Sequence, residues 1–354
     1  MIQRILCVCL TLCFLFGMGS ALADTQPQPI DIIPYDELPP AVDGQYHYLL
    51  LCVDQWTGKP WNLGNTDGMV MVTLDTRAHR VMLTSFIRDA LVQRPDGKIG
   101  RINYIAKNYS PEELCRVISQ HIGVRVDKYI LFYFSQIQDI IDYLGGVDIT
   151  ITAAEASYLT RYAIHKNATK PTIRSAGTYH FNGHAAVIYM RIRKAGGGGD
   201  FMRTQRVRTV LSTLADTCRE ITYDDAKALV DSIMSHTTMT NMNLDMMLTA
   251  MDQAYSLRDC TIEELRIPPD GAVHAITYAG MAVQELDWNK CRAAMADYLE
   301  NSFLVLDEDQ EAAFAAVDDD DGFGSFDDFG SFDDFSAFGD SDALSDIALP
   351  EDAE

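Results

Sequence analysis

Arginine and aspartate side chains recur at close spacing in the middle of this chain. Asp200, Arg203 and Arg206 follow four consecutive glycines at the predicted start of a helix, with both arginines in its first two turns. Asp200 stands where a helix N-cap is expected, and capping alone would account for it. Arginines in the first two turns are unfavourable beside the positive end of the helix dipole, unless an anion binds there. This spacing predicts an anion site.

A second arginine pair, Arg191 and Arg193, precedes the glycines. In an extended segment both side chains would lie on one face and point towards Arg203. A solvated, charged strand end is the alternative interpretation. The glycines lack the Gly-Lys-Ser/Thr ending of a phosphate-binding loop, so nucleotide binding is not indicated.

Three further candidates lie at the edges of apolar runs. Arg88 follows one such run, and Asp54 and Asp67 adjoin two others. Carboxylates that lie near clustered arginines without pairing to them could hold Mg²⁺ against phosphate oxygens. Ordinary surface-loop acids are the alternative for each aspartate.

Several familiar catalytic patterns are absent from the sequence. It contains no His-Glu-x-x-His, no Gly-x-Ser-x-Gly and no Cys–His pair at a characteristic spacing. Arginines and aspartates suit phosphoryl transfer, because its catalysis consists mainly of positioning and charge neutralisation.

The net charge of −23 comes mostly from one end of the chain. Residues 305–354 hold 18 Asp and Glu and no Lys or Arg, so the remainder carries only −5. A nearly neutral body gives no support for binding nucleic acid. Low complexity, including a repeated Gly-Ser-Phe-Asp-Asp-Phe hexad over 324–335, predicts a disordered acidic tail at 305–354.

The first 23 residues have the layout of an export signal. One positive charge precedes the uncharged run from Ile5 to Ala23, which ends in Ala-Leu-Ala. The run is also nearly long enough to span a bilayer, so residues 1–23 are either a cleaved signal peptide or a retained membrane anchor. Both place the chain outside the cytoplasm. Residues 24–45 contain five prolines and are predicted to be a linker.

The eight cysteines give no metal or redox motif. Three lie in the first 23 residues, and the other five are widely spaced. We expect these five to be buried free thiols, with a Cys260–Cys291 bridge as an open alternative.

Strand-like and helix-like patterns alternate between the linker and the tail. Apolar runs predict strands at 46–53, 69–74, 80–84, 130–134 and 147–151. Helical spacing predicts helices at 111–120, 135–144, 182–189 and 200–219, with further helices at 221–256 and a strand pair and closing helix at 262–300. This mixture predicts an α/β domain over 46–304, with a central mixed sheet flanked by helices.

Taken in order, these stretches resemble the LytR-CpsA-Psr family of cell-wall glycopolymer transferases. The similarity covers roughly residues 46–220. The stretches that carry it are Leu49-Leu-Leu-Cys-Val-Asp54, Thr66-Asp67-Gly-Met-Val-Met-Val, Leu83-Thr-Ser-Phe-Ile-Arg88-Asp89, Tyr143-Leu-Gly-Gly-Val147, Phe181-Asn-Gly-His-Ala-Ala-Val-Ile-Tyr-Met-Arg191-Ile-Arg193 and Asp200-x-x-Arg203-x-x-Arg206. The resemblance implies an α/β/α fold that binds polyprenyl pyrophosphate.

The resemblance also assigns roles to individual residues. The expected catalytic residues are Asp54, Asp67, Arg88 and Asp200, and Asp54 and Asp67 are the expected Mg²⁺ ligands. The expected pyrophosphate-binding residues are Arg88, Arg191, Arg193, Arg203 and Arg206. The chain departs from the family pattern at Asn65, Gly68 and Val207, where the family usually has Arg, Thr and Gln.

The activity implied by the resemblance is a Mg²⁺-dependent phosphotransfer. A glycopolymer, such as teichoic acid or capsular polysaccharide, would move from a polyprenyl-pyrophosphate carrier to peptidoglycan. The alternatives are a polyprenyl-pyrophosphate hydrolase and a non-catalytic, regulatory polyprenyl-phosphate-binding protein. The expected location is the outer face of the cytoplasmic membrane or the cell wall, in contact with the membrane surface. An apolar channel would hold the lipid. The run 130–134 is a candidate lining, although a core strand explains it equally simply.

Overall fold

The computed structural model describes residues 25–58, 62–160, 173, 175–193, 195, 199–236 and 239–300. The predicted signal or anchor, the glycines at 196–198 and the predicted acidic tail lie outside the described residues. The chain divides into two units, Met1–Glu311 and Ala312–Glu354, and all described residues belong to the first. Among the described residues, no helix has both the length and the apolar character needed to cross a membrane.

A six-stranded mixed sheet lies at the centre of the domain, in the order β10-β3-β2-β1-β6-β9. Its strands are β1 (Gln45–Val53), β2 (Thr66–Asp75), β3 (Arg80–Phe86), β6 (Lys128–Phe132), β9 (Met239–Thr240) and β10 (Ile262–Ile267). The β1–β2, β2–β3 and β6–β9 pairs are antiparallel, whereas β1–β6 and β3–β10 are parallel. This arrangement confirms the predicted α/β class with a mixed sheet.

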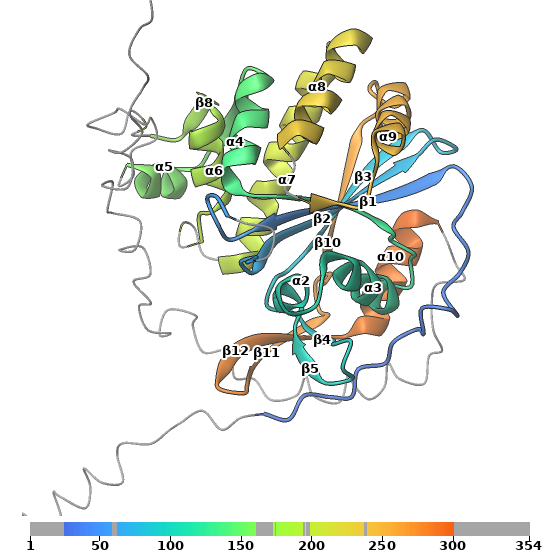
Figure 1. Ribbon diagram of the computed structural model, residues 1–354. Helices are drawn as coiled ribbons and strands as arrows, with labels where there is room; N and C mark the ends of the chain where they lie inside the picture. Colours follow the sequence, from blue (N-terminus) through green and yellow to red (C-terminus); the bar gives the residue numbers. More distant parts are fainter. Residues whose placement is uncertain are drawn as a thin grey trace, which may run out of the picture. The chain divides into compact units, whose positions relative to one another are not determined.

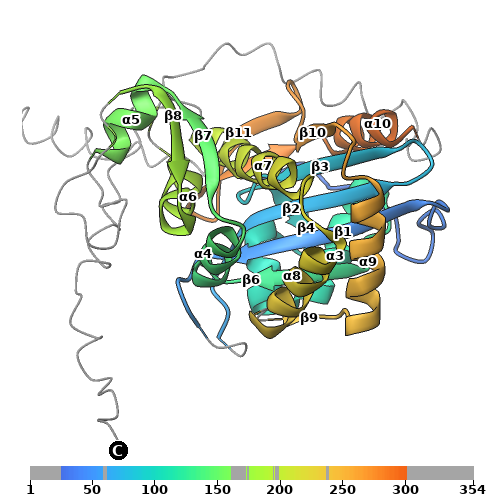
Figure 2. The same cartoon turned by 90° about the horizontal axis from the view of Figure 1, so that it is seen from above.

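Helices cover both faces of the sheet (Figure 1). One face carries α2 (Ile105–Asn108), α3 (Pro111–Ile122) and α10 (Trp288–Leu299), while α8 (Tyr223–His236) and α9 (Leu244–Ser256) lie on the other. Figure 2 shows α8 and α9 lying across the strands. Ser110 caps α3 by accepting from the Glu113 amide, and Pro111 is its first residue, as the sequence predicts.

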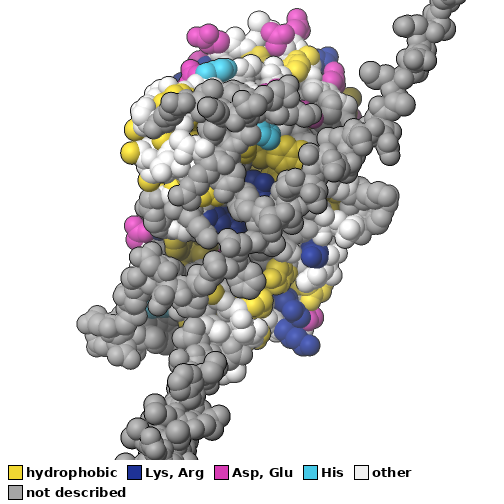
Figure 3. Space-filling model, turned by 90° about the vertical axis from the view of Figure 1, so that its left-hand side faces the viewer, with side chains coloured by type: hydrophobic (Ala, Val, Ile, Leu, Met, Phe, Trp, Pro, Cys, Tyr) yellow, Lys and Arg dark blue, Asp and Glu magenta, His cyan; other side chains and the backbone are white. Residues whose placement is uncertain are grey.

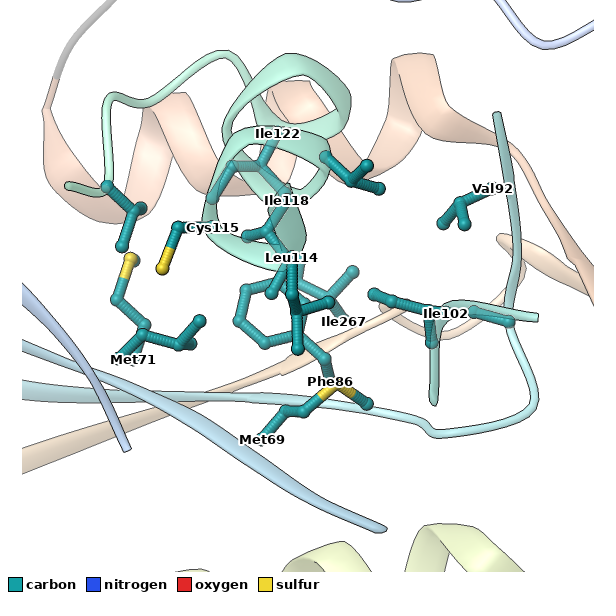
Figure 4. Packing of buried hydrophobic residues seen from close by; sticks show 14 of the residues in the cluster. Met69, Met71, Phe86, Val92, Ile102, Leu114, Cys115, Ile118, Ile122 and Ile267 are labelled. Carbon is teal, nitrogen blue, oxygen red and sulfur yellow. The ribbon is translucent and has the colours of Figure 1, made fainter. Parts of the chain in front are cut away.

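Alternate residues of β1 enter two different cores, because side chains alternate along a strand. Leu49 and Leu51 pack with the α3 and α10 side, and Figure 4 shows the neighbouring contacts of Met69, Met71 and Phe86 with α3. Tyr48 instead packs in a cluster under α8 and α9. Burial on both faces explains why the central strands are almost continuously apolar.

A smaller helical group with its own core adjoins one end of the sheet. It contains α4 (Phe134–Tyr143), α5 (Ala153–Leu159), α6 (Gly183–Met190), α7 (Gly199–Cys218) and the hairpin β7 (Val147–Ile151) with β8 (Gly177–Phe181). Through α7 this group contacts β3 and β10 of the central sheet. The group therefore brings residues 191–203 to the sheet.

Two more hairpins complete the domain. They are β4 (Leu91–Gln93) with β5 (Ile99–Arg101), and β11 (Val273–Tyr278) with β12 (Met281–Leu286). A short 3₁₀ helix, η1 (Ile102–Tyr104), leads from β5 into α2. All five described cysteines are free thiols, as predicted, so the alternative Cys260–Cys291 bridge is absent, but only Cys115, Cys260 and Cys291 are buried, whereas Cys52 and Cys218 are partly exposed.

Two local expectations from the sequence are wrong. Residues 190–193 were expected to be extended, but α6 continues to Met190 and Arg191 is its C-cap in the right-handed helical region. The run 130–134 was expected to be one strand, but β6 ends at Phe132 and α4 begins at Phe134. In both places a helix begins or ends inside the run that was predicted to be extended.

We predict that Gly183→Ala destabilises the protein. A Cβ atom on Gly183 would lie 2.1 Å from the backbone oxygen of Gln138 in α4, so α4 and α6 would have to separate. We expect the free energy of unfolding, measured by urea denaturation, to fall by about 1–3 kcal/mol. Gly100→Ala is the control, because its Cβ would meet only the flexible side chain of Arg94. Equal stability of the two variants would contradict the close α4–α6 contact.

Candidate functional site

The carboxylate of Asp67 is the point at which three arginines meet. Asp67 lies at the start of β2 and is only 8% exposed. Its Oδ2 atom accepts hydrogen bonds from Arg88 Nη1, from Arg203 Nη1 at 3.1 Å and from Arg193 Nη2 at 3.2 Å. Arg203 also donates to the backbone oxygen of Asp67 at 2.8 Å. One carboxylate thus holds three guanidinium groups from three separate parts of the chain.

The neighbouring elements explain this convergence. Arg88 follows β3, the neighbour of β2, so both residues lie at the same end of the sheet. Arg203 is in the first part of α7, and Asp200 in the first turn of that helix receives Arg203 Nη2 at 2.9 Å. Asp200 also lies 3.4 Å from Arg88 Nε. The carboxylate of Asp200 therefore faces the arginines and joins α7 to the end of β3.

Arg191 and Asp54 form a second, more exposed pair. Arg191 Nη2 lies 3.7 Å from Asp54 Oδ1, and the guanidinium lies 4.5 Å from the centre of the Phe134 ring. The Asp54 amide donates to the Asn65 oxygen at 2.8 Å, which fixes Asp54 beside the start of β2. Asp54 therefore lies at the same end of the sheet as Asp67.

The thiol of Cys52 shows that the two pairs are neighbours. Burial raises the pKa of this thiol, Asp67 and Asp54 raise it further, and Arg191 and Arg203 lower it. Cys52 pairs with Gly68 across β1 and β2, so it lies next to Asp67 and two residues before Asp54. Figure 3 shows Lys and Arg side chains near the middle of this side of the domain, next to hydrophobic and histidine side chains.

Positive charge is concentrated at this site. Burial acts to raise the pKa of Asp67, but Arg203, Arg88 and Arg193 together lower it below its usual value. Arg193 is the least enclosed of the three, with 44% of its side chain exposed. Burial lowers the pKa of Arg193, and repulsion from Arg88 and Arg203 lowers it further. An anion that binds here would relieve that repulsion.

Arg206, another predicted pyrophosphate-binding residue, is buried away from Asp67 and its arginines. Its guanidinium is buried and donates to Glu155 Oε1 at 2.7 Å, to the Ile192 oxygen at 2.8 Å and to the Ala195 oxygen at 3.0 Å. Glu155 Oε2 accepts from the Thr152 amide at 2.8 Å and so also caps α5. Arg206 therefore fixes the segment that carries Arg193.

Three residues at the site had no assigned role in the sequence. The buried side chain of Asn103 donates from Nδ2 to Asp67 Oδ1 at 3.5 Å. The backbone amide of Asn103 donates to the backbone oxygen of Arg88 at 3.3 Å. Asp89 lies 3.5 Å from Arg88 Nε and 3.3 Å from Arg101 Nη1. Two of them could have been noticed in the sequence. Asn103 is a polar residue within the otherwise apolar run Ile-Asn-Tyr-Ile, and Asp89 directly follows Arg88.

Buried polar atoms without hydrogen-bond partners gather at this end of the sheet. Among the described residues they include Asn65 Oδ1, Thr66 Oγ1 and Asn103 Oδ1. Each buried acceptor left without a partner costs about 1–3 kcal/mol. Their concentration beside Asp67 fits a site that binds a hydroxyl-rich or phosphate-bearing ligand together with water.

The two expected Mg²⁺ ligands, Asp54 and Asp67, are both paired with arginines in this structure. The described residues contain no group of three or more His, Cys, Asp or Glu side chains that could hold a metal alone. Mg²⁺ usually keeps several waters and takes only one or two carboxylates plus substrate phosphates. Asp54 and Asp67 would supply those carboxylates. Within the described part of the chain, Asp67 Oδ1 receives a single long hydrogen bond, from Asn103, whereas the three arginines bond to Oδ2.

Comparison with known protein families gives one match that spans most of the chain. A model of the LytR_cpsA_psr family matches residues 20–295. Similar curated proteins include the Bacillus subtilis polyisoprenyl-teichoic acid–peptidoglycan teichoic acid transferases TagV, 28% identical over 158 residues, and TagT, 25% identical over 214 residues. The alignments cover 43% and 59% of this chain but only 39% and 63% of TagV and TagT. Biofilm regulatory protein A of Streptococcus mutans is 22% identical over 209 residues, which are 56% of this chain and 50% of that protein.

Solved structures share the fold. The crystal structure of B. subtilis TagV has a TM-score of 0.58 and 20% identity, covering 73% of this chain and 99% of that chain. A structure of TagT bound to LIIa-WTA has a TM-score of 0.59 and 20% identity, covering 73% and 91%. A TagT structure with bound octaprenyl pyrophosphate lipid has a TM-score of 0.55 and 18% identity, covering 73% and 90%.

We predict that Asp67→Asn weakens the fold but strengthens the response to inorganic pyrophosphate. Without the carboxylate, the buried charge of Arg203 loses one of its two counter-charges and keeps Asp200, and the free energy of unfolding should fall by about 1–3 kcal/mol. Pyrophosphate without metal should then raise the Tm of the variant more than that of the unmodified protein, because it no longer competes with Asp67 for the arginines. Asp148→Asn, at an exposed aspartate, is the control. Equal Tm increases would contradict this competition.

The same variant has a predicted pH dependence. The folded protein holds the pKa of Asp67 below its usual value, so the stabilising effect of its charge is present above the unfolded pKa of about 4. It is lost as pH falls through the lower, folded pKa. The stability difference between the unmodified protein and Asp67→Asn should therefore shrink as the pH is lowered from 6 towards roughly 2. Urea denaturation over that range measures it, and a constant difference would be inconsistent with a depressed pKa.

Proposed function

Because this chain belongs to the LytR-CpsA-Psr family, we propose that it transfers a glycopolymer from a polyprenyl-pyrophosphate carrier to peptidoglycan. The observation that carries the proposal is the meeting of Arg88, Arg193 and Arg203 on one buried carboxylate. Three guanidinium groups in one place suit the several negatively charged oxygens of a pyrophosphate. The similarity to TagV and TagT, both teichoic acid transferases by name, supports the same activity.

The arginines would act on the leaving group. In the proposed reaction a peptidoglycan hydroxyl attacks the phosphorus that carries the glycan. The bond from that phosphorus to the bridging oxygen breaks, and the lipid monophosphate departs with the electron pair. Negative charge accumulates on the departing phosphate, where guanidinium groups fixed by the protein stabilise it without reorganising. Arg193, the most exposed of the three, is the first that an incoming phosphate would meet.

The attacking hydroxyl must lose a proton, and two carboxylates were expected to accept it. Asp67 is poorly suited to this, because the three arginines lower its pKa and occupy its Oδ2 atom. The side chain of Asp54 is 42% exposed and is only loosely paired with Arg191. We therefore assign the proton to Asp54 and the holding of the arginines to Asp67.

The expected Mg²⁺ ion enters the proposal together with the substrate. Asp54 and Asp67 would hold it, and the ion would neutralise charge on the pyrophosphate. Asp200 would keep its distinct role of fixing Arg88 and Arg203, since its carboxylate faces both. Metal removal with EDTA should therefore lower transfer while leaving the fold intact.

The apolar carrier requires a hydrophobic path from the site. The cluster under α8 and α9 contains side chains that are only partly buried, such as Leu50, Val72 and Ile137. Ile130 and Phe132 form part of the same cluster but are buried in β6, which supports their interpretation as core residues.

The proposed place of action is the outer face of the cytoplasmic membrane. The uncharged run from Ile5 to Ala23 supports export, either as a cleaved signal or as an anchor. A carrier with a polyprenyl chain is confined to the bilayer, so the site must work close to the membrane surface.

Transfer can be measured with purified protein, Mg²⁺, a labelled polyprenyl-pyrophosphate glycan and peptidoglycan. We expect wall-linked label, and we expect Arg203→Ala to slow its formation by about 10²–10³-fold, because one charge-stabilising group is removed. Arg219→Ala, at a partly exposed arginine paired with Asp216, is the control. Free glycan phosphate without wall-linked product would identify a hydrolase instead. Binding without either product would identify a regulatory binder.

We predict a positioning role for Asn103. Asn103→Ala removes the amide that faces Asp67 Oδ1, and kcat should fall by about tenfold, or about 1.4 kcal/mol, with little change in KM. Asn103→Asp places a second carboxylate beside Asp67, raises the pKa of Asp67, and should move the acid side of the pH–rate profile to higher pH. A purely structural role would leave that profile unmoved.

A further inference from the structure

Two hairpins and the end of α2 form one continuous surface, which we call the hairpin surface. It consists of residues 94–98 between β4 and β5, residues 278–281 between β11 and β12, and residues 104–109. The Gln284 amide donates to the Asp89 oxygen at 2.9 Å, and Arg101 Nη2 donates to the Ala282 oxygen at 2.8 Å. These bonds hold the two hairpins side by side, as Figure 1 shows.

Basic and tyrosine side chains lie together on the hairpin surface. Lys98 and Lys107 are exposed, and Tyr109 is 38% exposed. Arg94 Nε donates to Asp96 Oδ1 at 3.0 Å, and the Arg101 guanidinium lies 5.6 Å from the centre of the Tyr104 ring. Tyrosine with lysine and arginine is the composition found where proteins meet the headgroups of a bilayer.

The segment before β1 leads back to the hairpin surface. Residues 24–45 were expected to be a linker, but from Thr25 onward they are bonded along the domain. The Thr25 amide donates to the Thr277 oxygen of β11 at 2.8 Å, and the Ile33 amide donates to the Gln120 oxygen of α3 at 3.0 Å. The Tyr35 ring lies 4.7 Å from the guanidinium groups of both Arg116 and Arg125. The segment is therefore fixed at several points between α3 and β11.

This path determines how far the apolar run can be from the hairpin surface. Ala23, the last residue of the uncharged run, is two residues before Thr25. Two extended residues reach at most about 7 Å. If the run from Ile5 to Ala23 lies in a bilayer, the end of β11 must therefore lie at the bilayer surface.

The hairpin surface also adjoins the arginine site. Arg101 extends from β5 to Asp89 at 3.3 Å, and Asp89 lies 3.5 Å from Arg88. A membrane at the hairpin surface would thus be close to the arginines that meet at Asp67. Figure 3 shows further Lys and Arg side chains beside hydrophobic ones towards the lower edge of that view, at the height of the hairpins in Figure 1.

We propose that the hairpin surface docks on the headgroups of an anionic phospholipid bilayer. The exposed lysines contact the lipid phosphates, and the tyrosine rings lie at the level of the headgroups. The fixed segment 25–44 keeps this orientation, so the domain presents one defined side to the membrane. Docking does not depend on the transfer reaction and can be measured without any glycan substrate.

Hydrogen–deuterium exchange of the full chain in vesicles tests the proposal. The chain is reconstituted into vesicles of phosphatidylglycerol and phosphatidylethanolamine, and separately into vesicles of phosphatidylcholine alone. Amides at 94–98 and 278–281 should exchange several-fold more slowly in the anionic vesicles. The turn at 76–79, which joins β2 and β3 at their other end from Asp67, is the internal control and should exchange equally in both.

Charge-reversal variants separate docking from general membrane effects. Lys98→Glu combined with Lys107→Glu should abolish the difference between the two kinds of vesicle. Arg219→Glu, just after α7, combined with Lys227→Glu in α8 makes the same charge change away from the hairpin surface and should preserve that difference. Equal exchange at both hairpin turns in anionic and neutral vesicles would overturn the proposal. Protection that survives the hairpin variant would also overturn it. Neither outcome bears on whether the protein transfers a glycan.

Discussion

The stability of this site depends on one electrostatic balance, the buried carboxylate of Asp67 against three guanidinium groups. Like charges repel strongly where water is scarce, so Arg88, Arg193 and Arg203 can share a small volume because Asp67 lies among them, with Asp200 as a second counter-charge for Arg88 and Arg203. Each part of this balance comes from a different element. Asp67 is in β2, Arg88 follows β3, Arg193 follows α6, and Arg203 is in α7. The antiparallel β2–β3 pair is what places the acid and Arg88 at the same end of the sheet.

Much of this site could be predicted from the sequence, although not always for the right reason. Arg203 was found because cations are unfavourable at a helix N-terminus, and it does lie there. Arg193 was found by assuming an extended segment, whereas a helix end brings it to Asp67. Arg206 was expected beside the other arginines but is paired with Glu155. That residue is 51 positions away, and no local pattern reveals such a pair. The role of Asn103 could not be recognised from its own sequence neighbourhood, because only the fold brings it to Asp67 and Arg88.

The fold was predictable where one segment carries its own signal. The apolar runs of β1, β2 and β3 are long enough to identify strands, and Ser110 with Pro111 marks the start of α3. Which strands pair was beyond reach, because the parallel neighbour of β3 is β10, about 180 residues later. Polar or short strands such as β5 and β8 were also missed, since their pairing, not their composition, makes them strands.

The two oxygens of Glu155 connect helix geometry to the arginines. One oxygen caps α5 and the other receives Arg206, which in turn fixes the carbonyls on both sides of Arg193. The position of Arg193 beside Asp67 is therefore fixed when the protein folds, and a ligand does not have to order it on binding. The conformational entropy of the Arg193 segment is lost on folding, so it does not have to be lost again when a ligand binds. The arginine cluster is consequently preorganised for whatever anion it binds.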